Sequence, residues 1–428
     1  MLVDTASLPT LEEWGFNGGH EGLRRFCARA FSGTAPRFMR VHRHGEEILA
    51  IFRHSDLRLF GTMPALENVP PGIMFPADVA EEALAGGDVP GTSVATVLSN
   101  QLFTANAPIH RPLRMALLKM VGPKQTAELE SPARAIAADL LAPHRGGGEF
   151  DFVCEVSLPL VARYFGAMIG LTAEEAVGVS AAILEMSPLL NIDRSPAEVE
   201  QLYAGAGAYR RLIEGAAMRS LAEGNCPHVT ALAEELAGMP PCMDVHRSGV
   251  VPRNAGMFIV GNFFDAFHTA AVAVSNAVFV LVDWFEMLDG HRDDANFLDR
   301  AVAEALRLEP PLIGLSRYVF EEVRSGDVIF PSNSKVFLMW GAANRDPAAY
   351  PQPDSFNPQR STRSVTFGGG EHICPGRFAG TMLARAVIAT LLEMRVWPEV
   401  QGAQITWREN SLANQPEYMP VRLSKRAG

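Results

Sequence analysis

The stretch TFGGGEHICPGRFAG, residues 366–380, surrounds one cysteine, Cys374, with glycines, a histidine and a proline. A cysteine binds a metal ion as the thiolate, and a buried anion without compensation is costly. Glycines let the backbone approach a flat ligand closely and turn peptide N–H groups toward the sulfur. Pro375 is typical of a first helical turn, so we expect a helix over 377–392 whose positive end favours the thiolate. The stretch predicts a loop that presents a metal-binding cysteine.

Composition narrows the class of protein. The chain has 428 residues, of which 48% are hydrophobic, and a net charge of -11 with no basic block, which argues against a nucleic-acid partner. Its five cysteines form no CxxC pair and no regular spacing, which fits free thiols in a reducing compartment. The start, MLVDTASLPTLEEWG, shows no secretory signal. We therefore expect a cytoplasmic protein, and length alone suggests two or three domains.

The longest apolar tract runs from about Ala255 to Phe285 and is long enough to raise the question of a membrane span. Asn262, Asp265 and His268 interrupt it, and each would be costly in lipid. The tract therefore predicts a long helix buried in a protein core, with no membrane contact.

Helical periodicity dominates most of the remaining chain. Strands are expected in a hairpin over 37–53 that turns at His44-Gly45-Glu46, over 317–330, and near the C-terminus. Residues 61–100 are rich in Gly, Pro and small side chains and predict a functional loop or lid. The expected helices cover 21–31, 110–121, 125–141, 159–171, 173–186, 197–221 and 296–308.

The segment FGGGEHICPG, residues 367–376, resembles the haem-binding signature FGxGxHxCxG of the cytochrome P-450 superfamily, with every fixed position filled. Glu304 and Arg307 resemble the family's ExxR pair, on a helix that Pro310 and Pro311 end. Arg360 in FNPQR resembles the arginine that completes this buried ionic triad, and Asn344-Arg345-Asp346-Pro347 resembles the turn before it. The order and spacing of these motifs make a chance match hard to obtain.

This resemblance implies one mainly α domain over 1–428, with the cytochrome P-450 fold and a long central buried helix over a haem. A small β-rich part is expected near 36–53, 316–340 and the C-terminus, and the single domain replaces the two or three suggested by length. Cys374 would be the axial thiolate ligand of haem b iron. The family pattern assigns the remaining cofactor-binding residues as follows: Phe367 and Gly368 in the signature, and His110, Arg114, Arg317 and His372 for the haem propionates.

The same resemblance implies a soluble bacterial-type monooxygenase that inserts one atom of O₂ into a small, largely hydrophobic substrate. Its electrons would come from a separate ferredoxin-like or flavodoxin-like protein. Arg111, Arg114, Lys119 and Arg377 predict a basic patch that docks this acidic carrier. Substrate contacts are expected from the 61–100 loop, Gly261, Phe264, residues 312–315 and residues 412–414.

The central helix departs from the family pattern (A/G)Gx(D/E)T. With Thr269 at the threonine, the acid position holds His268, and Asp265 replaces the small residue one turn earlier. Asp265 and Thr269 share a helical face, whereas His268 is turned about 100° from Thr269. His268 is interpreted as a core histidine or a proton relay. Asp265 is interpreted as a proton donor, a partner for a substrate cation, or a structural carboxylate capped by Asn262 or Thr269.

Three functions stay open from the sequence. The departure on the central helix permits a peroxide-using or O₂-independent haem-thiolate enzyme instead of a monooxygenase. A haem-binding protein without turnover is the third. Thr269, with Asp265 or His268, is the predicted catalytic group for the first of these.

Overall fold

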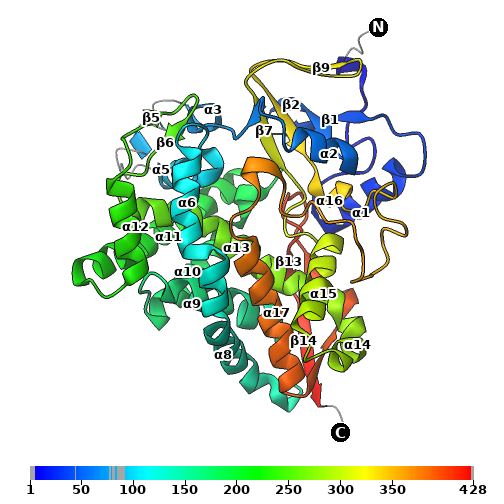
Figure 1. The fold of residues 1–428 in the computed structure, drawn as a ribbon. Coiled ribbons are helices and arrows are strands. Elements are labelled where there is room, and N and C mark those ends of the chain that lie inside the picture. Colours follow the sequence, from blue (N-terminus) through cyan, green and yellow to red (C-terminus); the bar gives the residue numbers. More distant parts are fainter. Residues whose placement is uncertain (1–4, 44, 77–78, 80–81, 84–91, 426–428) are drawn as a thin grey trace.

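The computed structural model describes residues 5–43, 45–76, 79, 82–83 and 92–425. Helices form most of the molecule, and the largest sheet lies toward the N-terminal end (Figure 1). The helices are α1 (Gly19–Ala30), α2 (His54–Phe60), α3 (Pro71–Met74), α5 (Thr92–Ser99), α6 (His110–Val121), α7 (Pro123–Glu128), α8 (Glu130–Leu141), α9 (Leu158–Ala167), α10 (Ala173–Glu185), α11 (Pro196–Glu223), α12 (Pro227–Ala237), α13 (Ala255–Leu281), α14 (Phe285–Gly290), α15 (Ala295–Leu308), α16 (Trp340–Ala343) and α17 (Arg377–Glu393).

The strands belong to one five-stranded sheet and four smaller ones. The large sheet has the order β1-β2-β10-β7-β3, with β1 and β2 forming the expected hairpin, although His44 in its turn lies outside the described residues. The strands are β1 (Phe38–Arg43), β2 (Glu46–Ile51), β3 (Leu66–Glu67), β4 (Glu149–Asp151), β5 (Met243–Asp244), β6 (Gly249–Val250), β7 (Leu315–Val319), β8 (Val323–Ser325), β9 (Val328–Phe330), β10 (Ser334–Leu338), β11 (Val396–Val400), β12 (Thr406–Trp407), β13 (Pro416–Tyr418) and β14 (Pro420–Lys425).

Helix α13 is the centre of the helical part and packs against α5, α9, α11, α15 and α17 (Figure 1). It begins where the side chain of Asn254 accepts a hydrogen bond from the Met257 amide at 2.9 Å. Among the described residues it belongs to the one helical stretch long and apolar enough to cross a membrane, but its side chains are largely buried inside the protein. The expected buried central helix is confirmed.

Several polar side chains of α13 find hydrogen-bond partners inside the core. Asn276 Nδ2 donates to the carbonyl oxygens of Glu309 and Asn414, and Ser275 bonds Ser157 at 2.7 Å. These contacts tie the central helix to the end of α15 and to the C-terminal segment. Burying these groups is tolerable because the Asn276 amide nitrogen and the Ser275 hydroxyl have partners, although Asn276 Oδ1 is buried without one among the described residues.

Two expectations for local structure were partly wrong. The helix expected over 125–141 is split into α7 and α8 at Leu129. The loop expected over 61–100 contains α3 and α5, and α5 packs on α11 and α13. Its small residues, including Thr92 and Ala95, are buried there, because small side chains let α5 approach these helices closely. Most of residues 77–91 lie outside the described part of the chain.

Candidate active site

A cavity of about 720 Å³ lies between α13, the large sheet and the loop that carries Cys374. Its wall is mainly apolar, as in most ligand sites, and combines segments from the whole chain. Cys374 and Phe367 belong to one part of the lining, and Asp265 and Thr269 on α13 to another. Further lining residues are Val69, Val94, Leu98, Leu102, Leu117, Phe165, Leu202, Phe264, Ala270, Ala273, Leu312 and Trp340.

The Cys374 loop has the predicted construction. Gly368 and Gly370 have φ of 71° and 64°, the left-handed region that side chains rarely adopt. A Cβ on Gly370 would lie 2.9 Å from the Gly61 carbonyl oxygen, so only glycine fits there. The Cys374 amide donates to the Phe367 carbonyl at 2.9 Å, which closes the loop. Gly368 shapes the turn and is absent from the cavity lining, whereas Phe367 is part of it.

Two opposing effects act on the thiol of Cys374. Burial raises its pKa, while the Gly376 amide, which donates to the sulfur, and the guanidinium groups of Arg377 and Arg114 lower it. Burial has the larger effect, so the loop alone does not ionise the cysteine. A bound metal ion would supply the remaining stabilisation of the thiolate.

A buried ionic triad fixes the segment that precedes this loop. Arg307 donates through Nε and Nη2 to the two carboxylate oxygens of Glu304, both at 2.8 Å, and Arg360 Nε donates to the same carboxylate at 2.8 Å. Arg307 also donates to the Asn344 carbonyl at 2.7 Å. The side-chain amide of Asn344 then donates to Thr366 Oγ1 at 2.8 Å, at the start of the Cys374 loop. The predicted triad is therefore assembled and connected to the candidate ligand.

Four basic or imidazole side chains predicted as propionate partners converge on the cavity: His110 and Arg114 on α6, Arg317 on β7, and His372 in the Cys374 loop. The rings of His110 and His372 are 4.6 Å apart. Burial lowers the pKa of Arg317 to about 10. Within the described part of the chain, no carboxylate forms an ion pair with Arg114 or Arg317. Buried cations without anionic partners are unfavourable unless a ligand supplies the negative charge.

Asn68, which the sequence did not single out, orients His372. Its Nδ2 donates to the Ala105 carbonyl at 2.8 Å and lies 3.2 Å from His372 Nδ1. Since the carbonyl contact fixes this amide nitrogen as a donor, Nδ1 accepts and the proton of neutral His372 resides on Nε2. Burial, followed by Arg317, lowers the pKa of His372 to about 3, which keeps the ring neutral. Asn68 is 304 positions from His372, so no local pattern reveals the pair.

These observations fit a haem. The cavity is lined by one half-buried thiol, by donors and cations for two carboxylates, and by apolar side chains for the flat face of the ring. Cys374 would hold the iron, and His110, Arg114, Arg317 and His372 would hold the propionates.

Asp265 and Thr269 lie on the cavity face of α13, as the helical geometry predicted. Thr269 Oγ1 donates to the Asp265 carbonyl oxygen at 2.5 Å. The Asp265 side chain is capped by neither Asn262 nor Thr269, since its Oδ1 accepts from Gln101 Nε2 at 3.0 Å. Burial within the protein raises the pKa of Asp265 to about 7, although the Gln101 hydrogen bond opposes the rise. The raised pKa favours the neutral, protonated form of this carboxyl more than in an ordinary aspartate.

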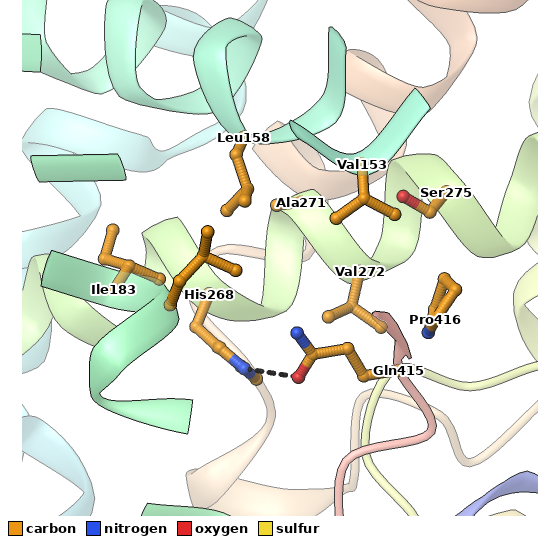
Figure 2. A pocket seen from close by; sticks show the side chains of 10 residues that line it. Val153, Leu158, Ile183, His268, Ala271, Val272, Ser275, Gln415 and Pro416 are labelled. Carbon is orange, nitrogen blue, oxygen red and sulfur yellow. Dashed lines mark hydrogen bonds between the residues drawn. The ribbon is translucent and has the colours of Figure 1, made fainter. Parts of the chain in front are cut away.

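His268 turns its ring toward the C-terminal segment, as Figure 2 shows. Its Nε2 lies 3.0 Å from Gln415 Oε1, and burial lowers its pKa to about 4. Nδ1 is buried and has no hydrogen-bond partner among the described residues. His268 also lines a small second cavity of about 10 Å³ together with Val272 and Pro416. This geometry favours a neutral core histidine over a proton relay, while part of the residue still reaches the large cavity wall.

The fold and this site together define a haem-thiolate protein of the monooxygenase class. A family model described as Cytochrome P450 matches residues 289–418, the part that contains the triad and the Cys374 loop. The chain belongs to the cytochrome P450 superfamily, and its relatives are bacterial cytochrome P450 proteins and hydroxylases.

Among the relatives, Cytochrome P450 107B1 of Saccharopolyspora erythraea is 27% identical over 331 residues, 76% of this chain and 78% of the relative. The Biotin biosynthesis cytochrome P450 of Bacillus subtilis is 25% identical over 74% of this chain and 78% of the relative. The 6-deoxyerythronolide B hydroxylase of Saccharopolyspora erythraea is 32% identical over a shorter region, 37% of this chain and 40% of the relative.

Solved structures confirm the fold. P450BioI, in complex with an acyl carrier protein ligated to hexadec-9Z-enoic acid, has a TM-score of 0.75 at 19% identity, over 90% of this chain and 94% of that one. A mutant of P450 EryK in complex with erythromycin B has a TM-score of 0.73 at 18% identity, over 98% of this chain and 100% of that one. These likenesses show the architecture, and the ligands named are those of the other proteins.

Proposed function

We propose that this chain is a single-domain, cytoplasmic haem-thiolate monooxygenase that oxidises a small organic substrate with electrons from a separate redox protein. The observation that carries the proposal is that Cys374 and the α13 face with Asp265 and Thr269 line one mainly apolar cavity. When bound, the haem would supply the one-electron and O₂ chemistry. The chain's own residues bind the substrate, exclude water and supply protons.

The residues that line the cavity indicate which of the predicted substrate contacts can enclose a substrate. Phe264, Leu312 and Leu315 are apolar and belong to the cavity wall, as the sequence predicted, whereas Gly261 packs against the Asn100 carbonyl outside it. Of residues 412–414, none is in the lining; Leu412 and Asn414 instead join the core packing around α1 and Glu309. An apolar cavity of this size favours a largely hydrophobic body for the substrate. A screen for ligands that shift the haem absorption band of the ferric protein tests this class directly.

The proton supply is assigned to Asp265. Its carboxyl faces the cavity beside Thr269, is held by Gln101, and has a raised pKa that favours the protonated form. An acid on this face can deliver a proton to oxygen bound in the cavity, either directly or through a water held by the Thr269 hydroxyl.

Replacing Asp265 by asparagine is expected to lower product formed per NADPH about tenfold, because an amide cannot supply a proton. The expected loss is smaller than the 10²- to 10⁴-fold effect that follows when a general acid is removed and nothing replaces it, because water in the cavity can still supply protons. The change is sterically small and keeps the acceptor for Gln101. Product, peroxide and NADPH consumption would be measured with a surrogate ferredoxin and the first substrate found by the absorption screen.

Asp265→Glu is the matched control and should restore part of the lost coupling. A large loss of substrate affinity with normal coupling would instead assign Asp265 to a substrate cation. Normal values for both quantities would show that Asp265 is a structural carboxylate.

The electron donor is proposed to be ferredoxin-like or flavodoxin-like and to dock near α6. The basic patch is smaller than expected, because Lys119 pairs with Glu235 and Arg114 lines the cavity. Arg111 is exposed, and Arg377 donates to the Cys374 carbonyl at 2.9 Å. Docking would therefore depend mainly on Arg111 and Arg377.

Reduction by such a donor is expected to slow as salt rises from about 10 to about 150 mM, where the Debye length falls from ~30 to ~8 Å. Arg111→Gln should slow reduction at low salt and flatten the salt dependence, whereas exposed Arg324→Gln on β8 should behave as wild type. Stopped-flow reduction of the ferric protein measures both. A rate indifferent to salt would exclude electrostatic docking at this face.

A peroxide-using enzyme is the second candidate, and the observation that favours it is the replacement of the family's small residue by an acid at Asp265. An acid beside the ligand site could assist cleavage of a peroxide supplied directly. Turnover with hydrogen peroxide that exceeds turnover with NADPH and a redox partner would select this function. A protein that binds haem and ligands but turns over with neither oxidant would be a binding protein.

A further inference from the structure

The cavity wall contains a second group of charged residues that neither Cys374 nor the predicted propionate partners explain. Arg43 lies at the end of β1, and Arg194 lies between η5 (Ser187–Leu190) and α11; both line the cavity. After burial, the charge that most lowers the pKa of Arg43, to about 10, is that of Arg194. The pKa of Cys374 instead depends on Asp265, Arg377 and Arg114. Arg43 and Arg194 thus line the same cavity, and the charge of Arg194 acts on Arg43.

The environment of Arg43 leaves part of its guanidinium unused. Nη1 donates to Ser316 Oγ at 3.3 Å, and Nε is buried without a hydrogen-bond partner. Ser316 and the predicted propionate partner Arg317 are consecutive on β7, so their side chains point to opposite faces of the strand. Arg43 therefore contacts β7 through Ser316 and not through Arg317, although all three residues line the cavity.

Two carboxylates near Arg43 and Arg194, those of Glu46 and Glu198, already have other hydrogen-bond partners. Glu46, opposite Arg43 in the hairpin, accepts from Lys335 Nζ at 2.7 Å. Glu198 accepts from the Ser195 amide and from Asn191 Nδ2, although its charge also favours the cationic form of Arg194. Across the described segments, no carboxylate lies within ion-pair distance of either Arg43 or Arg194.

The wall around this pair is apolar. Ile48, Leu189, Leu190, Val199, Leu202 and Leu315 belong to the same lining. Arg194 is half-buried and donates through Nε to the Pro188 carbonyl at 2.6 Å and through Nη2 to the Leu189 carbonyl, whereas Nε of the half-buried Arg43 has no acceptor. The two positive charges repel each other beside an apolar wall, and neither has a paired carboxylate, which is unfavourable in the empty protein. An oxyanion relieves both costs, because its oxygens accept several N–H donors and its charge offsets the repulsion.

We propose that Arg43 and Arg194 bind an oxyanion group of the substrate, a carboxylate or a phosphate, while its apolar body extends along the cavity toward Asp265 and Cys374. This inference rests on the proposed function, because it names the class of molecule that the same cavity would oxidise. The substrate would thus be an amphiphile with its anionic end at the β1 hairpin.

The test compares four ten-carbon probes on ferric holoenzyme: decanoate, decyl phosphate, decanamide and decan-1-ol. Dissociation constants come from the haem absorption shift and, independently of the haem, from calorimetry. Wild type is expected to bind at least one anion about 10- to 100-fold more tightly than the neutral probes, the range for hydrogen bonds to charged groups. The decanoate and decyl phosphate arms decide between carboxylate and phosphate.

The double variant Arg43→Gln/Arg194→Gln should lose this preference and still bind the neutral probes. Arg40→Gln is the matched control, since Arg40 is on the same strand but pairs with Glu47 outside the cavity. The inference is wrong if wild type shows no preference for anions, including the case in which no probe binds, or if the double variant keeps the preference.

The melting temperature, measured without any probe, distinguishes a ligand-binding role of Arg43 from a structural role. Arg43→Met should raise the melting temperature of ligand-free holoenzyme, because it removes a buried cation that repels Arg194. A fall would assign Arg43 to structural support and overturn its role here. The carbon monoxide spectrum of each variant should still show thiolate ligation, so failure of the anion site is distinguishable from failure of the proposed function.

Discussion

Cys374→Ser is expected to abolish the far-red-shifted Soret band that reduced, carbon-monoxide-treated protein shows when a thiolate is the axial ligand. Serine is nearly isosteric, so the loop closed by the Cys374 amide and the Phe367 carbonyl should persist. Its hydroxyl does not ionise near neutral pH and cannot replace the electron-donating sulfur. Monooxygenase activity should disappear with the band. Difference spectra and haem content measure the change.

The control for this prediction is Cys154→Ser. Cys154 is exposed and outside the cavity, and the other three cysteines, Cys27, Cys226 and Cys242, are also absent from its lining. Cys154→Ser should keep both the band and the activity. If Cys374→Ser kept the band, another residue would be the ligand and the site would be wrongly assigned.

Glu304→Leu is expected to destabilise the protein by about 3–5 kcal/mol, the usual cost of removing one partner from a buried ion pair. Arg307 is 1% exposed and donates two hydrogen bonds to Glu304, and Arg360 donates a third. The change leaves both cations buried without their shared anion. It also loosens the connection through Asn344 and Thr366 to the Cys374 loop, so haem should be lost faster.

Urea unfolding of the holoenzyme and the rate of haem transfer to an acceptor protein measure these two effects. Glu322→Gln is the control, because Glu322 pairs with Arg324 on the surface at 3.2 Å, where ion pairs contribute about 0–1 kcal/mol. Equal unfolding midpoints for the two variants would show that the triad is not a stabilising element.

Much of the architecture could be read from local patterns. α6 and α15 were predicted almost to the residue, because an amphipathic stripe and a capping or ending residue are local properties. The buried α13 followed from an apolar tract with interrupting polar residues, and the Cys374 loop from consecutive motif positions. The ExxR pair needed only the three-residue spacing that places two side chains on one helical face.

Other features depended on packing between distant segments. Residues 92–99 were expected to be loop, but burial against α11 and α13 stabilises a helix there despite weak periodicity. The sequence placed Asp265 and Thr269 on one face, yet the partner of Asp265 is Gln101, 164 positions away. The sequence allows two roles for His268, and its contact with Gln415 in the fold favours the core histidine.

By itself, then, the sequence determined the family, the ionic triad and the central helix and predicted the cysteine ligand, since each is encoded in residues close together along the chain. The tertiary structure decided which polar side chains meet across the cavity: Asn68 with His372, Gln101 with Asp265, and Arg43 beside Arg194. The physical reason is that hydrogen bonds and charge interactions act over a few ångströms of space, whatever the separation in sequence, so only the packed fold brings these groups within range.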